Sequence, residues 1–122
     1  MKNRILIVDD EDDINLLFKM VLEDNGFKVD VFNDPLEALQ NFTAGSYELL
    51  LLDIVMPSMN GFELYKKMRM IDNKCKVCFL TARKDVGKLV ARTATIENDI
   101  ENCIIIKPVE NEELVKMVKA QL

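Results

Sequence analysis

The chain contains no histidine, and only three of its 122 residues are cysteines. Without histidine, these residues cannot build a Ser-His-Asp or Cys-His nucleophile system. The strongest apolar runs are about four residues long, whereas a membrane span needs about eighteen. The net charge of −5 argues against a nucleic-acid surface, which requires clustered Lys and Arg. We therefore expect no direct contact of this chain with a membrane or with nucleic acid.

Two of the cysteines, Cys75 and Cys78, form a C-x-x-C pattern, which is typical of half a zinc site or of a redox pair. A zinc site needs two further ligands, and the chain offers only Cys103. Both Cys78 and Cys103 lie inside apolar runs. We therefore expect the cysteines to be reduced and to serve as small hydrophobic side chains.

The length and the hydrophobic content of 49% are ordinary for one globular domain, here residues 1–122. There is no linker, repeat or low-complexity tract. Only four apolar residues follow the first four positions before an acidic cluster begins, so no secretory signal is predicted and a cytoplasmic location is expected. The last predicted helix reaches Leu122 without a linker, which favours a stand-alone or trimmed domain.

Four short apolar runs each end in polar residues. Runs of this kind predict strands that are buried on both faces, as in a parallel sheet. The runs 5–8, 49–52, 77–80 and 103–106 are followed by Asp9-Asp10, Asp53, Thr81 and Lys107. Because the carboxyl ends of parallel strands share one edge, these side chains should converge on one site. Three carboxylates, a hydroxyl and an ammonium suit a divalent cation and a phosphoryl group.

Helical patterns separate the runs, and alternation over 27–31 predicts a further strand. The helices are expected from residue 14 to a stop at Asn25-Gly26, from Asp34-Pro35 to Gly45, over 62–69, more weakly over 84–96, and over 114–122. Leu17 and Leu36 are expected on apolar, core-facing stripes. Five strands alternating with five helices predict a doubly wound α/β fold with right-handed crossovers.

The acidic run after the first strand has two interpretations. It places negative charge at a helix N-terminus, which the helix dipole favours, or Asp9 and Asp10 bind Mg²⁺ while the next acids begin the helix. An EF-hand loop is excluded, because Ile14 occupies the position that requires glycine. Asp53 would add like-charge repulsion, which a metal cation would relieve. Thr81 as a helix cap and Lys107 as a solvated tip are ordinary roles, but together they suit a phosphoryl group.

Four segments together resemble the response-regulator receiver domain, the phosphoacceptor module of two-component signalling, including the chemotaxis regulators. They are ILIVDDE at 5–11, LLLDIVMP at 50–57 with Asn60-Gly61, FLTA at 79–82 and IKP at 106–108. The resemblance covers the whole chain. It implies a five-stranded parallel sheet in the flavodoxin-like order 2-1-3-4-5 with helices on both faces.

The resemblance also implies a ligand set and an acceptor. Asp53 would be the nucleophile that becomes aspartyl phosphate. Mg²⁺ would be bound directly by Asp10 and Asp53, by Asp9 largely through water, and by the backbone carbonyl of Val55. Such a domain is a signalling module rather than an enzyme, since it catalyses only its own phosphorylation and dephosphorylation.

The same resemblance assigns Lys107 and Thr81 to the phosphoryl group and predicts a cis peptide bond between Lys107 and Pro108. The donor would be a phosphohistidine on a sensor histidine kinase or phosphotransfer protein, because this chain has no histidine. A downstream effector protein or domain would receive the signal. A homodimer through the fourth and fifth helices is a further expectation.

The chain departs from the family pattern in its signalling half. Ile104 replaces the usual aromatic residue, and Ile100-Glu101 replaces Gly-Ala. The stretch between the threonine and the lysine is longer by about one helical turn, roughly four residues. We therefore expect residues 84–99 to carry the switch. Val55 and Arg83 would slow hydrolysis of the aspartyl phosphate.

Two other functions fit parts of the pattern. Asp10-Glu11-Asp12 imitates the signature of haloacid-dehalogenase-like phosphatases. That family places the nucleophile on the first strand and needs acidic ligands after the lysine strand, where only Glu110, Glu112 and Glu113 follow. The other alternative is a receiver-like binding adaptor that does not switch by phosphorylation, which the altered residues of the signalling half suggest.

Overall fold

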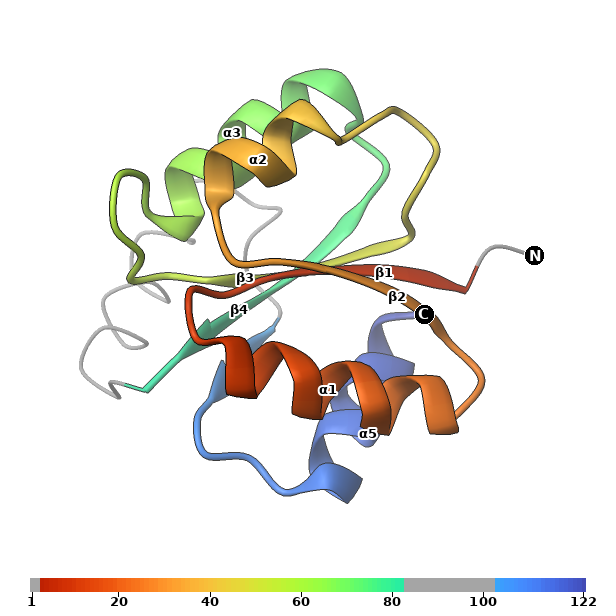
Figure 1. Cartoon of the computed structure of the whole chain (residues 1–122). Helices are drawn as coiled ribbons and strands as arrows, with labels where there is room; N and C mark the ends of the chain where they lie inside the picture. Colours follow the sequence, from red (N-terminus) through yellow and green to blue (C-terminus); the bar gives the residue numbers. More distant parts are fainter. Residues whose placement is uncertain (1–2, 83–102) are drawn as a thin grey trace.

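The structure, a computed structural model, describes residues 3–82 and 103–122. Five parallel strands form one sheet in the order β2-β1-β3-β4-β5, which confirms the expected order and doubly wound class. The strands are β1 (Arg4–Val8), β2 (Lys28–Phe32), β3 (Leu49–Asp53), β4 (Lys76–Thr81) and β5 (Ile104–Ile106), and the helices are α1 (Asp12–Asp24), α2 (Pro35–Gln40), α3 (Gly61–Ile71) and α5 (Asn111–Gln121). Helices α1 and α5 cover one face of the sheet, and α2 and α3 cover the other (Figure 1).

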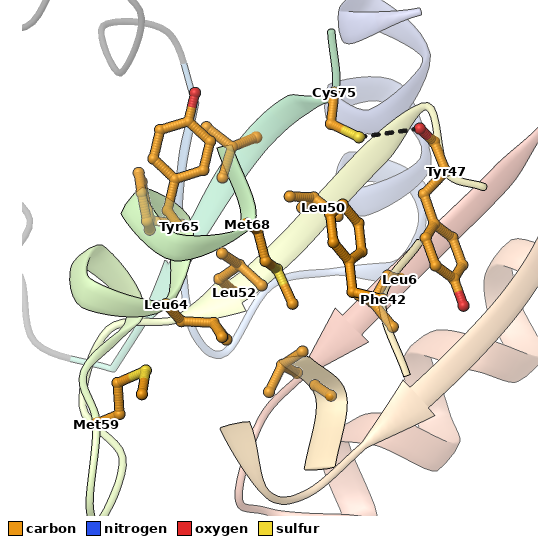
Figure 2. Close-up of a cluster of buried hydrophobic side chains, with 14 of the residues drawn as sticks. Leu6, Phe42, Tyr47, Leu50, Leu52, Met59, Leu64, Tyr65, Met68 and Cys75 are labelled. Carbon is orange, nitrogen blue, oxygen red and sulfur yellow. Dashed lines mark hydrogen bonds between the residues drawn. The ribbon is translucent and has the colours of Figure 1, made fainter. Parts of the chain in front are cut away.

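The unbroken apolar runs follow from this two-sided cover. Side chains alternate between the faces of a strand, so every position of a central strand needs an apolar residue. In β3, Leu50 and Leu52 belong to the core beneath α2 and α3, whereas Leu49 and Leu51 belong to the core beneath α1 and α5. Figure 2 shows the first of these cores. Among the described residues, no helix has the length and apolar character needed to span a bilayer.

Helix α2 begins as predicted but ends early. The Asp34 side chain accepts a hydrogen bond from the Leu36 amide, and Pro35 occupies the first turn. The expected end at Gly45 is wrong, because the helix stops at Gln40 and Asn41 caps it by donating to the Glu37 carbonyl. The expected inward orientation of Leu36 is also wrong, since this residue is 47% exposed.

Helix α1 turns most of the predicted stripe inward, with Leu17 as the exception. Phe18 and Leu22 are buried, but Leu17 is 43% exposed. Asn15 takes an inward position instead, and its Nδ2 donates to the Asp9 carbonyl at 2.7 Å. Leu17 therefore lies with Leu16 and Met20 among the exposed large apolar residues.

The cysteines correct another prediction. A disulfide joins Cys78 of β4 to Cys103, which precedes β5, with their Cα atoms 4.5 Å apart. Only Cys75 is free among the described cysteines, and it is buried. Residues three apart on a strand point to opposite faces, so Cys75 lies in the core of α2 and α3 and Cys78 in the other. The C-x-x-C pattern is therefore neither a redox pair nor half of a zinc site.

Several expectations concern residues outside the described ranges. They are the helix over 84–96, the switch over 84–99, the role of Arg83, the Ile100-Glu101 substitution and the added length before Lys107. These stay predictions.

Candidate functional site

The polar residues that end the strands converge at the carboxyl edge of the sheet, as the sequence predicts. Asp53 and Thr81 are the last residues of β3 and β4, and Asp9 follows β1 directly. The Lys107 amide donates to the Thr81 carbonyl at 2.8 Å, which joins the ends of β4 and β5. The Lys107–Pro108 bond is cis, as expected. The side chains of Asp9, Asp53, Thr81 and Lys107 are buried, whereas that of Asp10 is exposed.

Three carboxylates crowd together at this edge. Oxygen atoms of Asp9, Asp10 and Asp53 all lie within 4.8 Å of one another. Burial, followed by the charge of Asp9, raises the pKa of Asp53 to about 7. A carboxyl group in these surroundings is half-protonated near neutral pH unless a cation compensates its charge.

Lys107 supplies part of that compensation. Its Nζ lies 2.8 Å from Asp9 Oδ2, 3.1 Å from Glu11 Oε1 and 3.8 Å from Asp53 Oδ2. Burial alone would lower the pKa of Lys107, but the hydrogen bond and charge of Asp9, together with Asp53 and Glu11, outweigh burial and raise it. Lys107 therefore stays charged, with its ammonium closer to Asp9 than to Asp53.

A cavity of about 300 Å³ opens above these groups. Its lining comprises Asp10, Glu11, Asp53, Val55, Thr81, Ala82 and Lys107. The Val55 side chain is exposed at this rim. The cavity thus gives a small polar molecule access to the Asp53 carboxyl.

The first residues of α3 pack against the backbone of Asp53. Asn60 and Glu63 form a capping box, with the Asn60 side chain accepting from the Glu63 amide at 2.9 Å. The Gly61 amide donates to the Ile54 carbonyl at 3.0 Å. A Cβ atom on Gly61 would overlap the Asp53 carbonyl oxygen and lie 3.0 Å from its carbon. Glycine is therefore required for this helix to lie so close to β3.

The donor set fits Mg²⁺. This cation prefers oxygen ligands and usually takes one or two carboxylates, with waters and phosphate oxygens completing its shell. The three carboxylates offer such oxygens, and burial together with the charges of Asp9 and Asp10 raises the pKa of Asp53. Asp10 is exposed, so the group is accessible from the cavity.

The sequence interpretation missed one contact at this site. It assigned Glu11 only to the beginning of the helix, but the Glu11 carboxylate pairs with Lys107. Glutamate is not among the favoured N-cap residues, and Glu11 occupies the N-cap of α1 without a side-chain capping bond. That poor match of residue to position was the signal that could have revealed the contact.

Comparison with known proteins identifies the family. The sequence profile of the response regulator receiver domain matches residues 5–119. The chain belongs to this family. It is 38% identical to the transcriptional regulatory protein CpxR homolog of Haemophilus influenzae over 98% of its own length and 50% of that protein, and 35% identical to the transcriptional regulatory protein SrrA of Staphylococcus aureus over its whole length and 48% of that protein. This receiver domain thus spans about half the length of these relatives.

Solved receiver structures have the same fold. Response regulator TrrA of Thermotoga maritima, solved in complex with Mg²⁺ and BeF, is 34% identical, with a TM-score of 0.81 and full coverage of both chains. Chemotaxis protein CheY4 of Vibrio cholerae is 26% identical, with a TM-score of 0.84 and full coverage of both chains. Family membership argues against the haloacid-dehalogenase-like alternative, whose nucleophile would lie on β1.

Proposed function

We propose that residues 1–122 form one receiver domain, in which Asp53 accepts a phosphoryl group from a phosphohistidine of a sensor histidine kinase or phosphotransfer protein. The observation that carries this proposal is the convergence of Asp53 with two further carboxylates and a buried lysine beside an open cavity. The domain signals rather than turning over a substrate. We expect it to act in the cytoplasm and to pass its signal to an effector protein or domain.

In the transfer, a carboxylate oxygen of Asp53 attacks phosphorus, the new O–P bond forms, and the bond from phosphorus to the donor imidazole nitrogen breaks. The attacking group must be ionised, yet burial and Asp9 favour its protonated form. Asp9, Asp10, Asp53 and the Val55 carbonyl would hold Mg²⁺, which when bound supplies positive charge for both the carboxylates and the phosphoryl oxygens.

The two remaining residues would contact the phosphoryl oxygens. Lys107 lies 3.8 Å from Asp53 and carries a charge that neutralises a phosphoryl oxygen. Thr81 lines the same cavity from the adjacent strand, and its hydroxyl is a suitable donor. Positioning and charge neutralisation are the main requirements of phosphoryl transfer, and this arrangement supplies both.

The exposed apolar side chains of α1 offer a docking surface for the donor protein. Leu16, Leu17 and Met20 lie on the helix that starts beside the site. An apolar patch next to a reactive group is a usual place for a protein partner. A homodimer of the domain remains a separate expectation.

Intact-mass analysis after incubation with Mg²⁺ and acetyl phosphate tests the proposal. We expect the mass of one phosphoryl group to be added to the native protein and none to Asp53→Asn. Asp10→Asn should lower labelling through weaker Mg²⁺ binding, and higher Mg²⁺ concentrations should restore part of it. Asp13→Asn, which removes an exposed carboxylate of α1, is the matched control. A native protein that folds and stays unlabelled at any Mg²⁺ concentration would instead be a non-switching adaptor.

A further inference from the structure

Glu11 stands at the head of α1 but directs its carboxylate to Lys107. Its backbone amide donates to Asp9 Oδ1 at 2.9 Å, which fixes the residue beside the buried acid. Its side chain caps no amide of its own helix, and Oε1 accepts from Lys107 Nζ at 3.1 Å. The connection between β1 and α1 thus contributes two carboxylates to one ammonium.

The three distances around Lys107 indicate a competition. Its Nζ lies 2.8 Å from Asp9 and 3.1 Å from Glu11, but 3.8 Å from Asp53. An ammonium has three hydrogens to donate. Asp9 and Glu11 accept two of them, so a shift of Nζ toward a phosphoryl oxygen on Asp53 draws the ammonium away from its partners on the β1 side.

Glu11 is the partner that is more easily released. The side chain of Asp9 is fully buried, so separating it from Lys107 would leave an unpaired charge away from water. The Glu11 side chain is 59% exposed, and water replaces the lost bond when it lets go. The strength of the Glu11–Lys107 pair therefore sets how readily Lys107 turns to the phosphoryl group.

We propose that Glu11 is a positioning residue for Lys107, which holds the ammonium toward β1 in the unphosphorylated protein and competes with the phosphoryl group for it. This inference rests on the proposed function of Asp53. Ion pairs with an exposed partner contribute modestly, so the competition amounts to about two- to fivefold in an equilibrium constant.

The first test measures binding of beryllofluoride, a phosphoryl mimic, by isothermal titration calorimetry at saturating Mg²⁺. We expect Glu11→Gln, which keeps the side-chain size and removes the charge, to bind the mimic about two- to fivefold more tightly than the native domain. Asp13→Asn removes the same charge from the same turn and should bind it as the native domain does. The competition is overturned if Glu11→Gln binds beryllofluoride no more tightly than the native domain does. It is also overturned if Asp13→Asn gains as much affinity as Glu11→Gln.

The second test needs neither Mg²⁺ nor phosphate. In urea unfolding of the unliganded protein, Glu11→Gln should lower the folding equilibrium constant about two- to fivefold in the native background and leave it unchanged beside Lys107→Met. If Lys107→Met does not fold, this double-mutant cycle cannot be measured, and the NMR resonance of the Lys107 ammonium is followed instead. That resonance should shift in Glu11→Gln but not in Asp13→Asn. The Glu11–Lys107 pair is refuted if Glu11→Gln changes the folding equilibrium constant equally with and without Lys107. It is also refuted if the Lys107 resonance does not shift selectively in Glu11→Gln.

The two tests separate the inference from the proposed function. If neither the native domain nor any variant binds beryllofluoride, the proposed role of Asp53 is refuted. The competition for Lys107 is then refuted as well. The unfolding cycle still decides whether Glu11 holds Lys107.

Discussion

Asp53 lies in surroundings that disfavour its charge. The carboxyl group is buried, and Asp9 and Asp10 lie beside it, while Lys107 compensates only in part at 3.8 Å. In the absence of a cation, the native state therefore retains a proton that the unfolded chain releases. This single residue links the stability of the domain to pH and to metal binding.

The sign of that linkage gives a prediction. The pKa of Asp53 is about 7 in the folded protein and 3.8 in the reference state. Its contribution to stability is thus fully present below about pH 4 and is lost as the pH rises through about 7. Asp53→Asn should gain stability relative to the native protein over this range, by more than about 1 kcal/mol. Urea unfolding in a chelator, at several pH values, measures the difference.

Asp13→Asn is the control for that experiment, because Asp13 is exposed at the start of α1. Its stability should run parallel to that of the native protein over the same range. If the curve of Asp53→Asn is also parallel to the native curve, Asp53 is not protonated in the folded state.

Among the elements, α3 positions Asp53 most directly, since its first residue, Gly61, lies against the end of β3. The close approach of Gly61 to the Asp53 carbonyl leaves no room for a Cβ atom. The capping box of Asn60 and Glu63 fixes where the helix begins. Any side chain at position 61 must therefore push the helix away from the strand or shift Asp53.

Gly61→Ala should lower the free energy of unfolding by about 1–3 kcal/mol, the usual cost of overpacking. It should also lower labelling by acetyl phosphate, because Asp53 moves. Gly26→Ala is the matched control: Gly26 has a φ of +91°, and a Cβ atom there would meet no atom within 4 Å. That variant should lose about 1–2 kcal/mol through its backbone and still be labelled. Full labelling of Gly61→Ala would contradict the role given to α3.

Sequence patterns predicted elements better than their ends. The four-residue apolar runs identified the central strands correctly, because helices cover both faces of the sheet and every position of these runs is apolar. Gly45 did not end α2, since Asn41 caps the helix earlier and Gly45, with a φ of +80°, lies beyond it. Leu17 was placed inward because periodicity does not distinguish a core stripe from an exposed apolar one.

For the whole molecule, parallel topology explains why the site was predictable and the disulfide was not. Residues at the ends of parallel strands must converge, so Asp53, Thr81 and Lys107 come together whatever the exact register. The pairing of Cys78 with Cys103 depends on register, because Phe79 opposite Ile104 brings the preceding residues face to face. The apolar runs alone did not define that register.

The disulfide closes a loop between residues 25 apart, and its reduction should destabilise the domain by about 3.5 kcal/mol. Alkylation of the denatured protein should modify one thiol, that of Cys75, before dithiothreitol treatment and all three thiols after it. Cys75→Ser should then show no reactive thiol before reduction. Three modified thiols in the untreated protein would restore the original expectation of reduced cysteines.

The amide of Lys107 donates a hydrogen bond to the carbonyl of Thr81, and a disulfide joins Cys78 of β4 to Cys103 just before β5. The carboxyl ends of β4 and β5, which flank the cavity, are therefore linked to each other. Both links oppose separation of these strand ends, so we expect a phosphoryl group on Asp53 to displace side chains before it displaces the strands. We therefore predict that the Thr81 and Lys107 side chains at the cavity move first on phosphorylation, ahead of the strands that carry them.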